Sequence, residues 1–383
     1  MSAYSLPRSE PAPPGLCPTE PALRIDEVRR TADFAALSSE WSLLADEAKA
    51  SIFQTWEWAF SWWEVFGKED SLRLLTVRDA ADRLVGVAPL VLDSRRVGPV
   101  SFRTLELVGH HSVSSEYLDL IVSPQHRDAV IAALLDYVAG RWPDRLLHLY
   151  RVPASSATLE WVRLNRTSAY YAVLRSEPTL VIQLPQTWEE YLKVLSANTR
   201  RNIRRHRTRA SSELGAEFEV VIGGCEQHLE QLMELHQARM RSQGRRGSFA
   251  SAAFVRFHRA LLRRVSGRGW SRFFFLSVDG RPVAARYGFV LGGRLFDYSV
   301  GLDPAFERYS LGSVLLGHCA EYAIRAGLKY FDFLDAGDYK LHWNPREDPK
   351  LTVVLGPTRV ASFRTLFGLR ARAAGVVRKL LKR

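Results

Sequence analysis

The stretch from Leu295 to Trp343 constrains the fold more than any other part of this chain. Alternating apolar residues over Leu295–Val300 predict a strand, and a polar loop at Ser310–Ser313 follows it. An apolar helical pattern then runs to Gly327, and Lys329–Leu334 predicts a second strand. Strand, loop, helix and strand in this order form a βαβ unit. Its helix begins with free backbone N–H groups, which can hold a phosphate.

A short polar cluster follows the second of these strands. Asp338, Tyr339 and Lys340 lie in the loop at the carboxyl end of Lys329–Leu334, the edge where open α/β sheets bind ligands. The three side chains are therefore candidates for a catalytic centre, and a surface loop with a solvated charge pair is the alternative. Asp297, in the preceding strand, is a candidate general base or else a strand-end carboxylate paired with an arginine.

The length and the order of elements suit two domains rather than one. The chain has 383 residues, 46% apolar and 25% charged, as in ordinary globular proteins. The start of the chain, 1–22, is rich in proline and is expected to be a disordered tail. A strand, helix, hairpin and βαβ order over 213–360, with a strong hairpin signal at Asp279-Gly280, recurs more loosely over 23–177. We therefore predict two tandem α/β units, each with a mixed sheet.

A helical segment over 178–212 is expected to connect the two units. Thr187 and Glu190 fit a capping box that begins a helix, which carries into an arginine-rich stretch without acidic residues. One broad face of this helix holds Arg200, Arg201, Arg204 and Arg205. The face could bind a substrate phosphate, bind a nucleic-acid backbone, or be solvated. The lack of a recognisable module and of interleaved aromatic residues argues against nucleic acid.

The net charge of +12 comes from two local patches. Ser196–Ser212 holds six arginines, and 361–383 holds seven Lys or Arg, with no acidic residue in either. Removing these 13 from the 53 basic residues leaves 40 against 41 acidic ones. Because apolar residues are interleaved with the bases of the tail, the pattern predicts a peripheral contact with an anionic membrane surface. A frayed, soluble helix is the alternative.

The sequence predicts neither a metal nor a tightly bound cofactor. Its three cysteines are scattered and form no C-x-x-C pair. His110 and His111 lie near Glu116, but no third ligand has metal-site spacing, so a polar loop at an inter-domain cleft is the favoured interpretation. No apolar run approaches about 20 residues, and the start lacks a signal-peptide pattern. We therefore expect a cytoplasmic protein whose tail could reach the inner membrane face.

Three motifs give the chain a family resemblance over roughly Leu23 to Val360. The motifs are Phe53–Trp58 with Trp62-Trp63, then Asn198–Arg205, then Tyr309–Gly312 with Asp338–Lys340 and Trp343. In this order they resemble the tandem GNAT-fold acyltransferases related to the CelD/BcsL cellulose-biosynthesis proteins, which are distant relatives of the Fem aminoacyl-ligases. The resemblance implies two GNAT-like acyl-CoA N-acyltransferase units, the second of them catalytic.

The resemblance also implies an activity. The protein would move an acyl group from acyl-CoA, a co-substrate, to an amine of a sugar or other small acceptor, in extracellular polysaccharide biosynthesis. A Fem-like transferase that uses aminoacyl-tRNA is one alternative. A non-catalytic scaffold of a membrane polysaccharide synthase is another.

Roles for individual residues follow from the same resemblance. Lys340 would stabilise developing negative charge, Tyr339 would give a proton to the leaving thiolate, and Asp338 would orient either one. The loop that would hold the phosphates of coenzyme A contains Arg308, Tyr309, Ser310, Gly312 and Ser313. Relatives ideally have two glycines in this loop, whereas this chain has only Gly312. A plain turn with Ser310 as the helix N-cap is the alternative.

Overall fold

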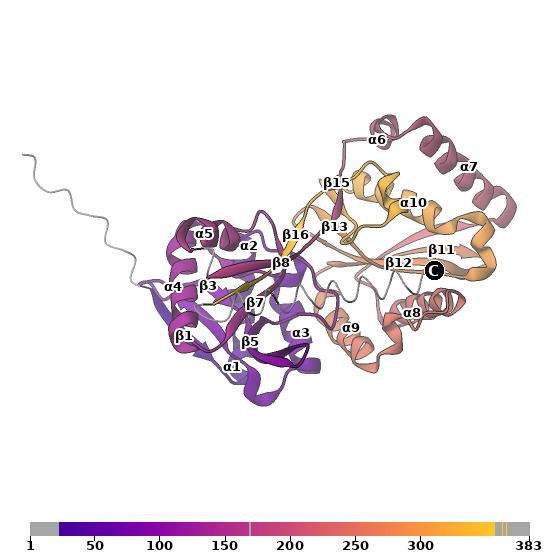
Figure 1. Cartoon of the computed structure of the whole chain (residues 1–383). Helices are drawn as coiled ribbons and strands as arrows, with labels where there is room; N and C mark the ends of the chain where they lie inside the picture. The colour runs from indigo at the N-terminus through magenta and orange to yellow at the C-terminus, as the bar shows by residue number, and fades with distance from the viewer. Residues whose placement is uncertain (1–22, 168–169, 357–361, 363–364, 366–383) are drawn as a thin grey trace, which may run out of the picture.

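The computed structural model describes residues 23–167, 170–356, 362 and 365. The tail predicted over 1–22 and nearly all of the basic tail predicted over 361–383 lie outside these residues, so both stay predictions. The described chain forms two α/β units side by side, which confirms the predicted mixed α/β fold class (Figure 1). No described helix combines the length and the apolar character needed to span a membrane.

The first unit contains a four-stranded sheet and most of a five-stranded sheet. Its strands are β1 (Arg24–Val28), β2 (Leu74–Arg78), β3 (Leu84–Ala88), β4 (Leu90–Val97), β5 (Val100–Leu107), β6 (Ile121–Val122), β7 (Leu146–Pro153) and β8 (Tyr171–Glu177). Its α-helices are α1 (Thr31–Ala36), α2 (Ser38–Glu47), α3 (Trp56–Phe66), α4 (Arg127–Arg141) and α5 (Ala157–Asn165). The sheet orders are β1-β2-β3-β6 and β4-β5-β7-β16-β8, and only β5 and β7 pair in parallel.

The second unit is built on a seven-stranded sheet in the order β10-β11-β12-β13-β14-β9-β15. The later strands of the chain are β9 (Leu180–Gln183), β10 (Glu217–Ile222), β11 (Ser271–Val278), β12 (Arg281–Leu291), β13 (Arg294–Leu302), β14 (Tyr330–Asp332), β15 (Arg346–Glu347) and β16 (Lys350–Leu355). The α-helices are α6 (Trp188–Val194), α7 (Ala197–Leu214), α8 (Glu226–Ser242), α9 (Ala252–Val265), α10 (Leu311–Arg325) and α11 (Asp338–Leu341). Helices α8 and α9 cover one face of the sheet, and α7 and α10 cover the other (Figure 1).

The two units exchange strands. β9 follows β8 along the chain, but it pairs with β14 and β15 in the sheet of the second unit. β16 follows β15, but it pairs with β7 and β8 in the sheet of the first unit. The predicted domain boundaries treat each unit as one continuous stretch, whereas the strand pairing puts 350–355 into the first unit's sheet.

Local sequence signals set the ends of several elements. Thr55 accepts a hydrogen bond from the Trp58 N–H at the start of α3, and Thr187 forms the expected capping box at α6. Asp279-Gly280 joins β11 to β12 with positive φ at both residues, as a tight hairpin turn requires. The helix expected to continue from α6 into the arginine-rich stretch instead ends at Val194. A new helix, α7, begins after Ser196, whose side chain caps it.

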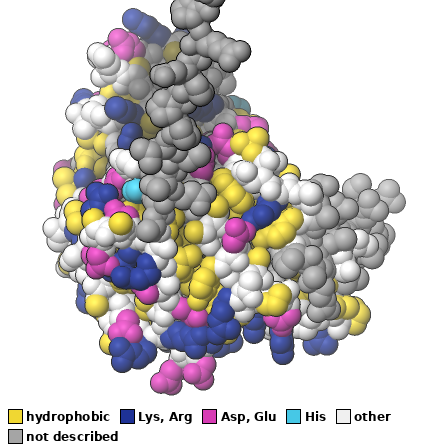
Figure 2. Space-filling model, turned by 90° about the vertical axis from the view of Figure 1, so that its left-hand side faces the viewer, with side chains coloured by type: hydrophobic (Ala, Val, Ile, Leu, Met, Phe, Trp, Pro, Cys, Tyr) yellow, Lys and Arg dark blue, Asp and Glu magenta, His cyan; other side chains and the backbone are white. Residues whose placement is uncertain are grey.

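One hydrophobic core runs through both units. Trp58 of α3 is fully buried, and its ring lies 5.1 Å from that of Phe257 and 5.7 Å from that of Phe289 in the second unit. Charge on the first unit is locally paired, for example Arg29 with Glu27 and Arg30 with Asp33. Acidic and basic side chains likewise lie next to one another on the face in Figure 2. The apolar contacts between the units hold in place any site that lies at their junction.

Candidate functional site

The sheet of the second unit opens where β13 leaves β14. The two strands pair in parallel over only three residue pairs, from Arg294 with Tyr330 to Phe296 with Asp332. β13 then continues to Leu302, whereas β14 ends. A register shift against β12 leaves Tyr298 as the extra residue of a bulge, which bends β13 further at this point.

Two adjoining clefts occupy this opening. The loop cleft, about 400 Å³, lies between β13, the end of α8 and the start of α10. The interface cleft, about 480 Å³, is lined by both units, since Ser114, Glu116 and Arg151 of the first unit face β13 and α11 of the second. The side chains shared by the two clefts are Arg239, Arg286, Val300 and Tyr339. Molecules bound in the two clefts would therefore meet at these four residues.

Lys340 lies buried at the junction between the two units. Only 6% of its surface is exposed, and its Nζ donates to the carbonyl oxygen of Phe333 at 3.2 Å and to the carboxylate of Asp335. Burial lowers the pKa of Lys340 to about 8. The predicted cluster is a short helix, α11, rather than a surface loop. A buried ammonium at the wall of a cleft can stabilise negative charge that develops on a bound molecule.

The neighbours of Lys340 point in different directions. Tyr339 is 45% exposed and lines both clefts, so its hydroxyl can reach a ligand in either. Asp338 is exposed and lines neither cleft. Of the three residues in the predicted catalytic cluster, the structure therefore places Lys340 and Tyr339 at the clefts and leaves Asp338 outside them.

Asp297 lines the interface cleft but is already paired. Its carboxylate accepts a hydrogen bond from the guanidinium of Arg286, and both side chains are almost completely buried. The Arg286 guanidinium also donates to the carbonyl oxygen of Gly312 at 3.4 Å, at the start of α10. Asp297 thus fits the predicted alternative of a paired carboxylate. Arg286 is a charged residue inside the apolar run of β12, a signal that could have identified it from the sequence.

The predicted phosphate loop is divided between two surroundings. Ser310, Gly312 and Ser313 line the loop cleft. Arg308 and Tyr309 lie outside that lining, and the Tyr309 ring lies 4.7 Å from the guanidinium of Arg209 on α7. Ser310 occupies the N-cap position of α10 with φ +55°, and its side chain makes no capping hydrogen bond. The part of the loop that faces the cleft is therefore its second half.

The predicted arginine face lies apart from both clefts. Arg200, Arg201, Arg204 and Arg205 line a separate groove along α7, which shares no lining residue with either cleft. Arg200 donates to the carbonyl oxygen of Leu195 at 2.6 Å, so it helps to satisfy the end of α6. The structure does not bring these arginines together with Lys340.

Three residues at the site were missed because they are distant in sequence. Glu116 is bound by Lys350 and Arg151, and burial raises the pKa of its carboxyl to about 7. Arg239 and His236 project from α8 into the interface cleft, and burial lowers the pKa of each. No short motif links these positions to Lys340. Packing of α8 against the sheet of the second unit brings Arg239 and His236 to the cleft, and the contact between the units brings Glu116.

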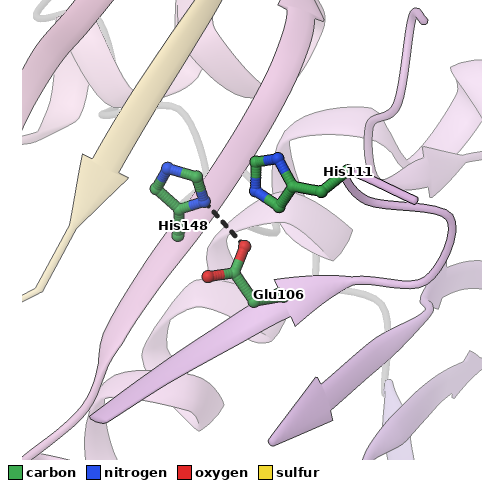
Figure 3. A group of neighbouring side chains, drawn as sticks. All are labelled: Glu106, His111 and His148. Carbon is green, nitrogen blue, oxygen red and sulfur yellow. Dashed lines mark hydrogen bonds and ion pairs between the residues drawn. The ribbon is translucent and has the colours of Figure 1, made fainter. Parts of the chain in front are cut away.

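A polar cluster in the first unit contains three ligand types that metals prefer (Figure 3). Glu106, His111 and His148 offer ligand atoms within 4.8 Å of one another, a set that sequence spacing did not reveal. The carboxylate of Glu106, however, already accepts a hydrogen bond from Nε of Arg95 at 2.8 Å, and it is hydrogen-bonded to Nδ1 of His148 at 2.7 Å. His148 and Arg95, which oppose the effect of burial, hold the pKa of Glu106 well below its usual value. Arg95 and His148 therefore already balance the charge of Glu106 without a metal ion. Whether the protein binds a metal is not tested by this arrangement, so the expected absence of a metal stays a prediction.

Comparison with known proteins identifies the second unit. Residues 197–341 match the family model of the acetyltransferase (GNAT) domain. This range contains α10, α11 and all of the residues that the second unit contributes to the two clefts. No curated protein matches the sequence. The chain therefore contains a GNAT-type acyltransferase domain, as the family resemblance implies.

Solved structures share the fold over both units. FemX is 10% identical with a TM-score of 0.59, and the match covers 86% of this chain and 96% of that chain. L-PGS from Bacillus licheniformis is 11% identical with a TM-score of 0.55, covering 91% of this chain and 99% of that chain. At such low identity the likeness shows the fold alone. The finer resemblance to the CelD/BcsL proteins stays a prediction.

Proposed function

We propose that the protein transfers an acyl group from acyl-CoA to an amine, with the donor in the loop cleft and the acceptor in the interface cleft. The observation that carries this proposal is the position of Lys340. Its buried ammonium lies beside the interface cleft, next to Tyr339, which lines both clefts. A reaction centre between two substrates needs such a position.

The loop cleft suits an extended donor with phosphate groups. The 15-residue helix α10 begins at this cleft, and free N–H groups at a helix start attract phosphate. Gly312 lines the cleft, and a Cβ at this position would lie 3.1 Å from the side chain of Leu302. A larger residue there would narrow the space that the donor occupies.

The chemistry assigns one step to each residue at the junction. The amine nitrogen attacks the thioester carbonyl carbon, a C–N bond forms, and the C–S bond breaks. The Lys340 ammonium stabilises the negative charge that develops on the carbonyl oxygen. The Tyr339 hydroxyl gives a proton to the leaving thiolate. The Glu116 carboxylate, whose pKa of about 7 suits a general base near neutral pH, accepts the proton of the amine.

The acceptor in this proposal is a sugar amine or another small amine. Polysaccharide biosynthesis is the setting that the family resemblance implies. A polar interface cleft lined by charged residues from both units suits a hydrophilic acceptor better than an apolar one.

The proposal is tested with acetyl-CoA as donor and glucosamine as acceptor. We expect coenzyme A to raise the melting temperature and acetyl-CoA to release a thiol in the presence of the amine. Ser313→Phe, an exposed position in the loop cleft, should abolish both effects. Ser211→Phe, an exposed position on α7 outside every cleft described above, should preserve them. If coenzyme A and its thioesters neither bind nor react, the acyl-CoA proposal is wrong and the scaffold alternative gains support.

A second candidate function uses aminoacyl-tRNA as the donor. Within the part of the chain that the structure describes, no carboxylate pairs with Arg200, Arg201, Arg204 or Arg205, so this face could bind a phosphate backbone. Acidic side chains at Asp303 and Glu307 also line the loop cleft, which weakens its attraction for coenzyme A phosphates. Loss of tRNA binding in an Arg201→Gln, Arg205→Gln double variant, with no binding of coenzyme A to wild type, would favour this candidate.

A further inference from the structure

We propose that the acceptor carries an anionic group, a carboxylate or a phosphate, which Arg239 and Arg245 bind in the interface cleft. This inference rests on the proposed acyl transfer at the same site, and it narrows the acceptor to an anionic amine. It derives from the balance of charges around the cleft.

The cleft holds more positive than negative side chains. Its basic residues are Arg151, Arg239, Arg245, Arg286 and Lys340, and its acidic residues are Glu116, Asp297 and Asp335. Each acid is already bound to one of the bases, in the pairs Arg151–Glu116, Arg286–Asp297 and Lys340–Asp335. Among the described residues, no carboxylate forms an ion pair with Arg239 or Arg245. The unmatched charge of the cleft is therefore located on these two arginines.

Arg239 is held in a position that an anion would stabilise. It lies half-buried in the last turn of α8, and burial lowers the pKa of its guanidinium, with Arg286 and Arg245 adding repulsion. A partly desolvated guanidinium gains from a charged hydrogen-bond acceptor, which its planar group can bind through two parallel hydrogen bonds. A basic residue near the carboxyl end of a helix also stabilises the helix dipole. This effect does not explain why Arg239 is half-buried, because the exposed Arg241 in the same turn can stabilise the dipole equally well.

The position of Arg245 indicates that the anionic group belongs to the acceptor rather than to the donor. Arg239 lines both clefts, whereas Arg245 lines only the interface cleft. His236 lies beside them and is buried, and burial lowers its pKa, so its imidazole is neutral at pH 7 and does not compete for the anion. A carboxylate or phosphate on the acceptor would thus bind next to the arginines while its amine faces Glu116 and Lys340.

Three amino sugars test the inference by titration calorimetry in the absence of a donor. Glucosamine has no anionic group, glucosamine 6-phosphate has a phosphate, and muramic acid has a carboxylate. We expect at least one anionic sugar to bind about tenfold more tightly than glucosamine, the size of one good charged hydrogen bond. Which of the two binds more tightly decides between phosphate and carboxylate.

Matched variants locate the anion. Arg245→Gln and Arg239→Gln should each remove the preference for the anionic sugar, and Arg241→Gln, on the same helix but outside the cleft, should keep it. Equal binding of all three sugars, or a preference that survives both cleft variants, would overturn the inference.

A measurement of thiol release separates this inference from the proposed function. Acetylation of glucosamine as fast as of the anionic sugars would support the proposed function and contradict the inference. An anion preference without thiol release from any thioester would support an anion site at Arg239 and Arg245, but it would contradict the proposed function and therefore the role of this site in binding the acceptor.

Discussion

Bonded side chains of Glu106 and His148 lie on the parallel strands of the first unit, whereas two clefts lie beside the parallel strands of the second unit. In each unit one parallel pair extends over three residue pairs, β5 with β7 and β13 with β14. In each, an arginine on the preceding strand bonds a carboxylate, Arg95 with Glu106 and Arg286 with Asp297. Both units therefore contain a short parallel strand pair with an arginine–carboxylate pair beside it.

The two units differ in what the second parallel strand, β7 or β14, contributes to the carboxylate. In the first unit, His148 on β7 lies opposite Glu106 and binds its second carboxylate oxygen. In the second unit, β14 ends at Asp332, and no described residue of β14 bonds Asp297. Glu106 therefore has bonded partners on both neighbouring strands, whereas Asp297 has a bonded partner on β12 but none on β14 among the described residues. A strand that ends early leaves room for a ligand.

Changing Leu355 to Ala tests whether the two units behave as one. Leu355 is fully buried in β16, the strand that the second half of the chain inserts into the first unit. Loss of its side chain should lower the free energy of unfolding by about 2–5 kcal/mol. Because strands are exchanged in both directions, tryptophan fluorescence and circular dichroism should report one common transition in urea. Leu164→Ala, at an exposed position, is the control, and two separate transitions would contradict the expectation.

Changing Lys340 to Met tests whether the open cleft performs the chemistry. Single-turnover acyl transfer should slow by about 100-fold or more, because an electrostatic donor to the transition state is lost. Donor binding should change much less, since the interaction belongs mainly to the transition state. Lys193→Met, an exposed lysine of α6, provides the matched control. A wild-type rate in a folded Lys340→Met protein would remove Lys340 from the mechanism.

The pH dependence of stability tests the burial of the same lysine. Burial lowers its pKa to about 8 in the folded protein, so between pH 8 and the ordinary lysine pKa the unfolded chain binds more protons at this position. The free energy of unfolding of wild type, relative to Lys340→Met, should therefore rise with pH in this window, by up to about 1.4 kcal/mol per pH unit. Below pH 8 the difference should be constant. Denaturant titrations at several pH values measure it, and a flat difference throughout would place the lysine in a solvated setting.

Changing Glu106 to Gln should have the smallest effect on catalysis. The Glu106–His148 pair lies inside the first unit, and neither residue lines the clefts. The rate of acyl transfer should therefore equal that of wild type at a temperature where the variant is folded. A slower rate in folded protein would mean that the first unit contributes to the chemistry, and the contrast between the two units would fail.

Local signals in the sequence predicted much of the fold. The βαβ order around α10, the Asp279-Gly280 turn and the caps at Thr55 and Thr187 all depend on residues close together in the chain, and the structure has each of them. The strand exchange depends instead on pairing between distant segments, for which β9 and β16 carry no local signal. Sequence pattern alone could not choose their sheets.

The same distinction applies to the candidate site. Lys340 and Tyr339 were found because they follow a strand within one motif, but Asp338 was included although successive residues of a helix point in different directions. Glu116 and Arg239 join the site from positions far along the chain. Their charges could be recognised from the sequence, but their proximity to Lys340 could not.

The exchange of β16 also determines when the first unit can be completed during synthesis. Strand β8 pairs only with β16 among the described strands, and β16 lies between β8 and β7. When residues 23–177 have been synthesised, β4, β5, β7 and β8 are present, but β16, which lies between β7 and β8 in the sheet, has not yet been made. Two unpaired strand edges remain open until Leu355 has emerged, and such edges can pair with other chains. We expect nascent chains of this protein to need protection from aggregation until nearly the whole described sequence has been translated.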